Sequence, residues 1–431
     1  MEREEWSSTL GFILASIGSA VGIGNIWRFP YIVGANGGGA FLVPYLIAIF
    51  LFGLPLMVLE LAIGRSTGTS IVSAFRSIQQ RFTAAGIAIV AVVSLILGYY
   101  LVITGWVLAY AFSFALGRPV EFGAFTGSYL PLAFFLLSGL AVYVTVRSGV
   151  REGIERLSRY LIPALLVILI FLVAVSLTEP GAFEGIEFYL SPDFSKLTDP
   201  AVWIAAFGQA FFSLSVGMGI LITFGSYLRK GSLFRNATII AVADILIAVL
   251  AGLVIFPLVF TAGLDPAAGV NLAFISLPTA FMEIQYGMLL GTLFFLMLFA
   301  AALTSAASML EVPVAALMDS YGYPRKRATL LVFAVIMLLG LPSALSYTAL
   351  NLEVFGTPFL DLADYMFGTI GLIVAGLIVS IVGGWFMSRT RICAEIDGCG
   401  WQQRAYMVLI RYGVPAILLV TLIGNFFRVV G

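Results

Sequence analysis

Apolar runs recur from one end of this chain to the other, and short loops that carry most of its charges separate them. Each run holds about 20 residues, the length that an α-helix needs to cross the hydrocarbon core of a bilayer. Hydrophobic residues make up 61% of the chain, against roughly 45–50% in soluble domains. No strand-like alternation with regular turn signals recurs, which argues against a β-barrel. The pattern therefore predicts an all-α integral membrane protein.

The spacing of the apolar runs predicts eleven spanning helices, and the loop charges predict their orientation. We expect the helices near residues 10–31, 39–63, 84–116, 124–146, 158–178, 200–227, 236–262, 286–318, 328–348, 363–387 and 404–427. Lys and Arg gather after every second helix, as in the run from Arg147 to Arg159, whereas the loop after the fifth helix is acidic. Positive loops stay in the cytoplasm, so the N-terminus is expected inside and the C-terminus outside.

The sequence lacks the residues that several classes of reaction require. The chain has no histidine, which removes Ser/His catalysis, histidine-dependent zinc hydrolysis and histidine proton relays. Cys393 and Cys399 are spaced unlike any common zinc pattern. No spanning segment carries paired acids at a spacing suited to Mg²⁺, and no basic patch with interleaved aromatic residues suggests nucleic acid. We expect neither an enzyme nor a nucleic-acid partner.

Two apolar runs are interrupted near their middle by glycines and polar residues. The first interruption is Gly18–Asn25, and the second is Ser213–Gly219. An interior Gly costs a helix about 0.5–1 kcal/mol relative to Ala, and any backbone group freed inside a bilayer needs another partner. Close helix packing through glycine is the alternative reading of each segment taken alone. The matched pair favours two five-helix units of opposite topology, 10–178 and 200–387, followed by an extra helix at 404–427, with a ligand site at the midplane.

The two ends of a broken helix suit different ligands. A half-helix N-terminus presents unpaired N–H groups and a partial positive charge, which favour a carboxylate. A half-helix C-terminus presents free carbonyl oxygens, which suit a hard cation such as Na⁺. Asp244 lies deep in an apolar run, where acids are functional by default, although a protonated structural Asp is the alternative.

The segment from Gly18 through Gly24-Asn25-Ile26-Trp27-Arg28-Phe29-Pro30-Tyr31 to Phe41 resembles the neurotransmitter:sodium symporter family. The segments Gly208–Ser215 and Leu303–Ser305 also resemble it, and eleven helices are similar to the prokaryotic type. The resemblance covers essentially the whole chain and implies one transporter domain over residues 1–431 in the cell membrane. It implies sodium-coupled symport of an amino acid or amine by alternating access.

The resemblance also implies two sodium ions as cofactors. The first sodium site would use Ala20, Asn25, Ser213 and Asp244 together with the substrate carboxylate; the second would use Gly18, Val21, Ala301, Thr304 and Ser305. Many members are expected to have a neutral Asn where this chain has Asp244. Because Asp244 and the substrate carboxylate would balance two Na⁺, we expect transport without chloride.

For the substrate, the resemblance implies a small pocket between the broken helices. Its residues would be Ser19, Ala20, Gly22, Ile23, Gly24, Ile96, Tyr100, Phe212, Ser215, Met218, Ala306 and Met309. Amine-carrying members have an Asp where Gly22 stands, so an amino acid is favoured, and the uncharged wall favours a neutral apolar or aromatic side chain. An amine or betaine carrier and a non-transporting amino acid sensor stay as alternatives. The partners expected are the amino acid and the bilayer, with the chain as a monomer or weak homodimer.

The same resemblance implies a gate at each end of the path. Arg28 and Asp364 would pair outside, above a lid of Tyr100 and Phe212. Inside, Arg3 would pair with Asp319, and Trp6, Ser226 and Tyr227 would pack nearby. Two further acids lie in or near spans: we expect Glu60 to cap a polar cluster near the cytoplasmic end of the second helix, and a counter-transported proton on Glu311 or Asp244 is left open.

Overall fold

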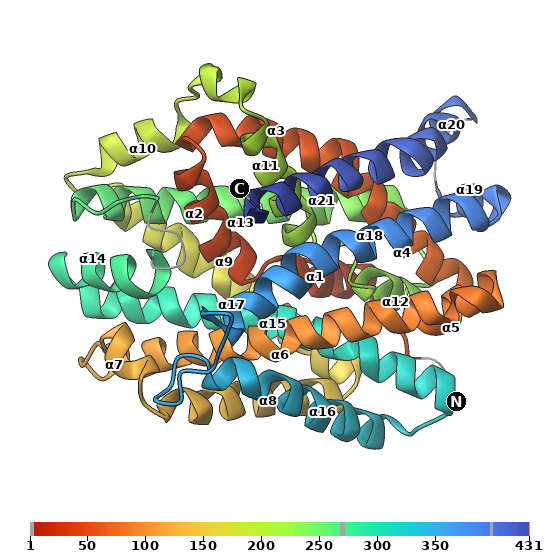
Figure 1. Cartoon of the computed structure of the whole chain (residues 1–431), viewed down its shortest axis with the longest axis horizontal. Helices are drawn as coiled ribbons and strands as arrows, with labels where there is room; N and C mark the ends of the chain where they lie inside the picture. The colour runs from red at the N-terminus through yellow and green to blue at the C-terminus, as the bar shows by residue number, and fades with distance from the viewer. Residues whose placement is uncertain (1–3, 268–271, 397–399, 431) are drawn as a thin grey trace.

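The protein is a bundle of long, roughly parallel and antiparallel helices (Figure 1). The computed structural model describes residues 4–267, 272–396 and 400–430. Nine of the described helices are long and apolar enough to cross a membrane, and a tenth span is the bent pair Thr9–Ala20 and Gly24–Ala35. The broken helix at 200–226 supplies the eleventh segment that the sequence predicts.

The spanning segments follow the predicted order, several of them as two helices in line. They are α1 Thr9–Ala20 with α2 Phe29–Ala35, α3 Leu42–Ala48 with α4 Leu54–Thr67, α6 Thr83–Ala115, α8 Leu130–Arg147, α9 Arg156–Ser176, α11 Pro200–Ser213 with α12 Ile220–Ser226, α13 Leu233–Thr261, α15 Gly287–Tyr321, α16 Arg325–Leu345, α17 Phe359–Ala363 with α18 Leu372–Ile381, and α20 Gly400–Val408 with α21 Val414–Val430. Short π-helical turns continue some of these helices, as at Gly24–Arg28 and Val150–Glu155.

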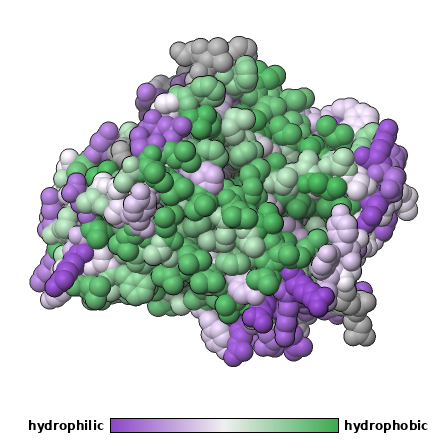
Figure 2. Space-filling model, turned by 60° about the horizontal axis from the view of Figure 1, so that its bottom comes forward, coloured by the Kyte–Doolittle hydropathy of each residue, from purple (hydrophilic) through white to green (hydrophobic). Residues whose placement is uncertain are grey.

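Short elements that were expected as loops cover both ends of the bundle. They are α5 Ile71–Ile78, α7 Phe122–Thr126, α10 Ala182–Leu190, α14 Leu277–Glu283 and α19 Arg389–Glu395, with a small hairpin of β1 Glu353–Val354 and β2 Thr357–Pro358. In Figure 1, α7, α10 and α14 lie at the left end, whereas α5, α19 and the N-terminus lie at the right end. Apolar side chains cover the broad face between the ends, as a bilayer requires (Figure 2).

The first break separates α1 from α2 by a bend of 50°. The backbone leaves the helix at Val21, where φ and ψ are −74° and 114°. The freed N–H group of Gly22 donates to the side-chain oxygen of Asn25 at 3.2 Å. This hydrogen bond replaces one of the backbone hydrogen bonds that the interrupted helix lacks. It also holds the polar side chain of Asn25 inside the break.

The second break, Leu214–Gly219, depends on backbone angles that favour glycine. Ser215, Gly217 and Gly219 have positive φ values of 52°, 86° and 73°. A side chain at Gly217 would also come within 2.9 Å of a backbone nitrogen of α18. The Gly217 N–H donates to the carboxylate of Glu60 at 2.5 Å, so Glu60 satisfies a backbone group freed by the break. Its expected place in a polar cluster near the cytoplasmic end of its helix stays a prediction.

The two breaks lie in the interior of the bundle. α1 packs against α9, α13 and α15, and α12 packs against α4 and α15. Both interrupted segments are buried almost throughout. The surrounding helices therefore shield from lipid the backbone groups that have lost their helical hydrogen bonds.

Candidate functional site

Residues from four helical segments form a polar cluster at the first break. The Asn25 amide donates to the Asp244 carboxylate at 2.6 Å and to the Ser213 hydroxyl at 2.9 Å. Ser213 donates to the other Asp244 oxygen at 2.7 Å, and the Tyr45 hydroxyl donates to Ser213 at 3.2 Å. All of these side chains are buried. A carboxylate, an amide and a hydroxyl are hard oxygen donors, so the set fits a buried monovalent cation.

A second group of oxygens lies where α1 meets α15. The Thr304 hydroxyl donates to the carbonyl of Ala301 at 3.0 Å, and Ser305 donates to the carbonyl of Ser19 at 3.1 Å. Gly18 lies so close that an added side chain would come within 3.1 Å of Thr304. The structure thus brings α1 carbonyls and α15 hydroxyls together, as a second set of oxygen donors would need.

The backbone beyond the first break meets an aromatic lid. The Ile23 N–H donates to the Tyr100 hydroxyl at 3.2 Å. A methyl group at Gly22 would lie 2.7 Å from the same hydroxyl, and one at Gly24 would lie 2.8 Å from the Phe212 ring. A side chain at either position would therefore displace Tyr100 or Phe212 from the place it has in this conformation.

The remaining predicted pocket residues are packed into the same core. They are Ile96 on α6, Met218 in the second break, and Ala306 and Met309 on α15, each at most 2% exposed. Ser215 donates to the Ser19 carbonyl at 3.0 Å, which links the second break to the first. The wall between the breaks is apolar and uncharged, and polar groups come from the broken backbones.

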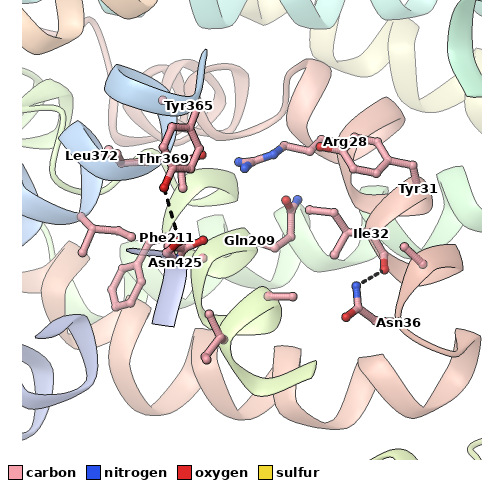
Figure 3. A pocket seen from close by; sticks show the side chains of 16 residues that line it. Arg28, Tyr31, Ile32, Asn36, Gln209, Phe211, Tyr365, Thr369, Leu372 and Asn425 are labelled. Atoms are coloured by element: carbon pink, nitrogen blue, oxygen red, sulfur yellow. Dashed lines mark hydrogen bonds between the residues drawn. The ribbon is translucent and has the colours of Figure 1, made fainter. Parts of the chain in front are cut away.

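At the end of the molecule that carries Asp364, called here the outer end, two cavities approach the lid. A cavity of about 50 Å³ is lined by Arg28, Asp364, Tyr100 and Phe212 among others. A larger one of about 280 Å³ lies between α2, α11, α18 and α21. Figure 3 shows the Arg28 and Gln209 side chains pointing into this larger pocket, with a hydrogen bond from Tyr365 to the Asn425 carbonyl on its opposite wall.

Arg28 lies over the Phe212 ring, with its guanidinium carbon 4.3 Å from the ring centroid. No Arg28 nitrogen comes within 4 Å of an Asp364 oxygen in the described part of the chain. The two groups line one cavity without forming the predicted ion pair in this conformation. Their role as an outer gate stays a prediction.

At the opposite, inner end, an indole and a buried ion-pair network close the bundle. Trp6 donates from Nε1 to the Phe224 carbonyl at 3.0 Å and packs edge-on against the Phe224 and Tyr227 rings. Asp319 accepts a hydrogen bond from the Ser70 N–H at 2.6 Å, and Ser226 donates to the Thr223 carbonyl. The predicted partner of Asp319, Arg3, lies outside the described residues.

The inner network is centred on Glu311 and Arg325, whose pairing the sequence reasoning missed. Arg325 donates to both Glu311 oxygens, at 2.7 and 2.8 Å, and Tyr227 donates to one of them at 2.6 Å. The Nε of Arg325 pairs with Glu4 at 2.5 Å. Both Glu311 oxygens therefore accept hydrogen bonds from fixed partners in this conformation. A counter-transported proton on Glu311 or Asp244 stays a prediction. The sequence did contain a sign of this pairing. An acid within an apolar run needs a cation beside it, and Arg325 in the next loop was available.

An all-α membrane protein whose two broken helices converge on buried oxygen donors has the architecture of a secondary transporter. The model of the sodium:neurotransmitter symporter family matches residues 3–121 and 127–430. The chain belongs to that family.

Similar proteins agree with this assignment over nearly the whole chain. An uncharacterised sodium-dependent transporter of Haemophilus influenzae is 35% identical and covers 99% of each chain, and one of Methanocaldococcus jannaschii is 38% identical, covering 92% of this chain and 85% of the relative. The crystal structure of MhsT in complex with L-phenylalanine is 41% identical, with a TM-score of 0.91 over 99% of this chain and 100% of that one. The rat sodium- and chloride-dependent GABA transporter 2 is 31% identical over 74% of this chain.

Proposed function

We propose that this protein carries a neutral, apolar or aromatic amino acid into the cell together with two sodium ions. It would lie in the cell membrane with its N-terminus in the cytoplasm and its C-terminus outside. The observation that carries the proposal is the buried cluster of Asn25, Ser213 and Asp244 beside a broken helix. An ionised carboxylate in a membrane interior needs a cation, and Na⁺ would supply it.

The substrate class rests on the surroundings of Gly22. A side chain here would come within 2.7 Å of the Tyr100 hydroxyl, so an acid at this position would require Tyr100 to move. Without an acid, the carboxylate of an amino acid would bind the N–H groups near Ile23 and Gly24 and the first sodium ion. The apolar wall then favours an uncharged side chain, in keeping with the phenylalanine bound to MhsT.

Asp244 would make chloride unnecessary. Its negative charge and that of the substrate carboxylate would balance two Na⁺ inside a medium of low dielectric constant. Several relatives are named as sodium- and chloride-dependent transporters. In this chain the carboxylate of Asp244 would take the place of a mobile anion.

The proposed stoichiometry provides ample driving force. At a potential of about 100 mV, each of two charges gains about 2.3 kcal/mol. A tenfold Na⁺ gradient adds about 1.4 kcal/mol for each ion. The sum of roughly 7 kcal/mol would support about a 10⁵-fold accumulation of substrate without leak.

The test is uptake of labelled amino acids into proteoliposomes with and without an inward Na⁺ gradient. We expect phenylalanine or another neutral apolar amino acid to accumulate only with the gradient. Sodium-dependent binding without accumulation would favour a sensor on this scaffold. Uptake of an amine or betaine alone would overturn the proposed substrate class.

A further inference from the structure

A crevice of about 350 Å³ lies between α5, α6, α15 and α16, at the inner end of the bundle. Most of its wall is apolar, from Ile87, Val90, Ala316, Leu317 and Val332. None of the residues assigned above to sodium, substrate or gates lines it. The crevice is therefore separate from the predicted transport path, and any ligand that it binds would differ from the transported ones.

The position of the crevice indicates that it faces lipid. Ile87 lies near the start of α6 and Leu317 near the end of α15, and both helices are long and apolar enough to cross a membrane. Ile87 is 53% exposed, so the apolar wall opens onto the side of the bundle. At this depth headgroups meet acyl chains. In the predicted orientation the leaflet is the cytoplasmic one, which is rich in anionic lipids.

The polar groups of the crevice suit a phosphate. Among the described residues that line it, Arg76 on α5 is the only charged one. Arg76 donates to Ser73 at 3.2 Å, and its five N–H groups match phosphate oxygens. The hydroxyl of Ser320 is buried and has no hydrogen-bond partner among the described residues. The crevice thus combines a guanidinium with a largely apolar wall, as the phosphate and acyl chain of a phospholipid would require.

We propose that this crevice binds an anionic phospholipid of the inner leaflet. One acyl chain lies along Val90, Ala316 and Val332, while the phosphate binds Arg76. The lipid holds α5 against α15 beside the hydrogen bond from Ser70 to Asp319. Lipid occupancy then favours the closed inner end.

Native mass spectrometry of the full chain in detergent tests this site by counting bound phosphatidylglycerol and phosphatidylcholine. The Arg76→Gln variant should lose phosphatidylglycerol about fivefold, the size of effect expected of one basic side chain near an anionic membrane. Arg81→Gln is the matched control, because Arg81 lies in the turn directly after α5 but stacks on Phe82 and Phe386. It should bind phosphatidylglycerol as the unmodified chain does.

Further variants keep the test decisive if Arg76→Gln folds poorly. Arg76→Lys should retain most binding, whereas Ala316→Phe, which fills the crevice, should lose it while keeping the charge. Equal losses in Arg76→Gln and Arg81→Gln, unchanged binding in Ala316→Phe, or equal binding of phosphatidylcholine would overturn the proposal. Thermal stabilisation by inorganic phosphate alone as large as that by phosphatidylglycerol would also overturn it.

Discussion

At the inner end of the molecule a buried guanidinium is held by two carboxylates, whereas at the outer end Arg28 lies over an aromatic ring. Arg325 makes three charge-assisted contacts of 2.5–2.8 Å with Glu311 and Glu4. Arg28 makes a cation–π contact at 4.3 Å, and its guanidinium forms no ion pair within 4 Å among the described residues. Both arginines are largely buried, but only the inner one has its charge matched at close range.

This difference indicates which end opens more readily. Two cavities approach the lid from the outer end, and Phe212 is only partly buried. The inner end is closed by Trp6, which is 8% exposed, and by a network that joins α15, α16 and the N-terminal segment. Opening the inner end requires several charged hydrogen bonds to break together, whereas opening the outer end requires one ring to move from beneath a cation.

Among the variants considered, Arg325→Gln should have the largest effect on how readily one end of the molecule opens. It leaves the Glu311 carboxylate buried without its cation, and removing one partner of a buried pair costs about 3–5 kcal/mol. We expect the inner end to open, which hydrogen–deuterium exchange over residues 4–12 and 224–228 would detect as faster exchange. The outer end should keep its exchange rates.

Two variants control for a general loss of stability in that experiment. Arg229→Gln removes an exposed pair with Glu5, in which the side chains are 65% and 49% exposed, and should change little. The double variant Glu311→Gln with Arg325→Gln leaves no buried charge and should recover much of the protection. Equal effects of Arg229→Gln and Arg325→Gln would contradict the role given to the buried network.

Phe212→Leu should have a smaller effect, confined to the outer end. It keeps an apolar side chain but removes the cation–π contact, worth about 0.5–2 kcal/mol. We expect faster labelling of a cysteine placed at Ile103, which lines the outer cavity, in a background without native cysteines. Phe212→Tyr retains the ring and should label at the original rate, so faster labelling of the Tyr variant would refute the contact as the cause.

Asp364→Asn should have the smallest effect on the closed conformation. Its carboxylate does not reach Arg28 within 4 Å in the described structure, so the loss should be at most about 1 kcal/mol. Labelling at Ile103 should change less than in Phe212→Leu. A larger change in Asp364→Asn would mean that the ion pair, and not the aromatic contact, closes the outer end.

Much of this architecture could be predicted because membrane spans and helix breaks leave strong local signals. The apolar runs gave all eleven segments, and glycines with neighbouring hydroxyls marked both breaks. The cluster of Asn25, Ser213 and Asp244 came from the family resemblance, and the structure brings these three side chains together. Their assignment as sodium ligands stays a prediction.

What could not be predicted depends on contacts between distant segments. Glu60 reaches Gly217 across 157 residues, and no local pattern pairs a carboxylate with a particular backbone N–H. The partner of Glu311 begins the following helix, where Arg325 was read only as a marker of a cytoplasmic loop. The short helix α10 was missed, and the end of α7 was merged with the following helix, because so few residues carry no distinct periodicity.

In the transport cycle that we propose, Asp244 supplies the negative charge that balances sodium. Na⁺-driven uptake of phenylalanine, or of another accepted amino acid, tests this in proteoliposomes in which gluconate replaces chloride on both sides. We expect undiminished uptake by the unmodified chain and a strong loss in Asp244→Asn under the same conditions. Uptake by the unmodified chain that collapses without chloride would contradict it.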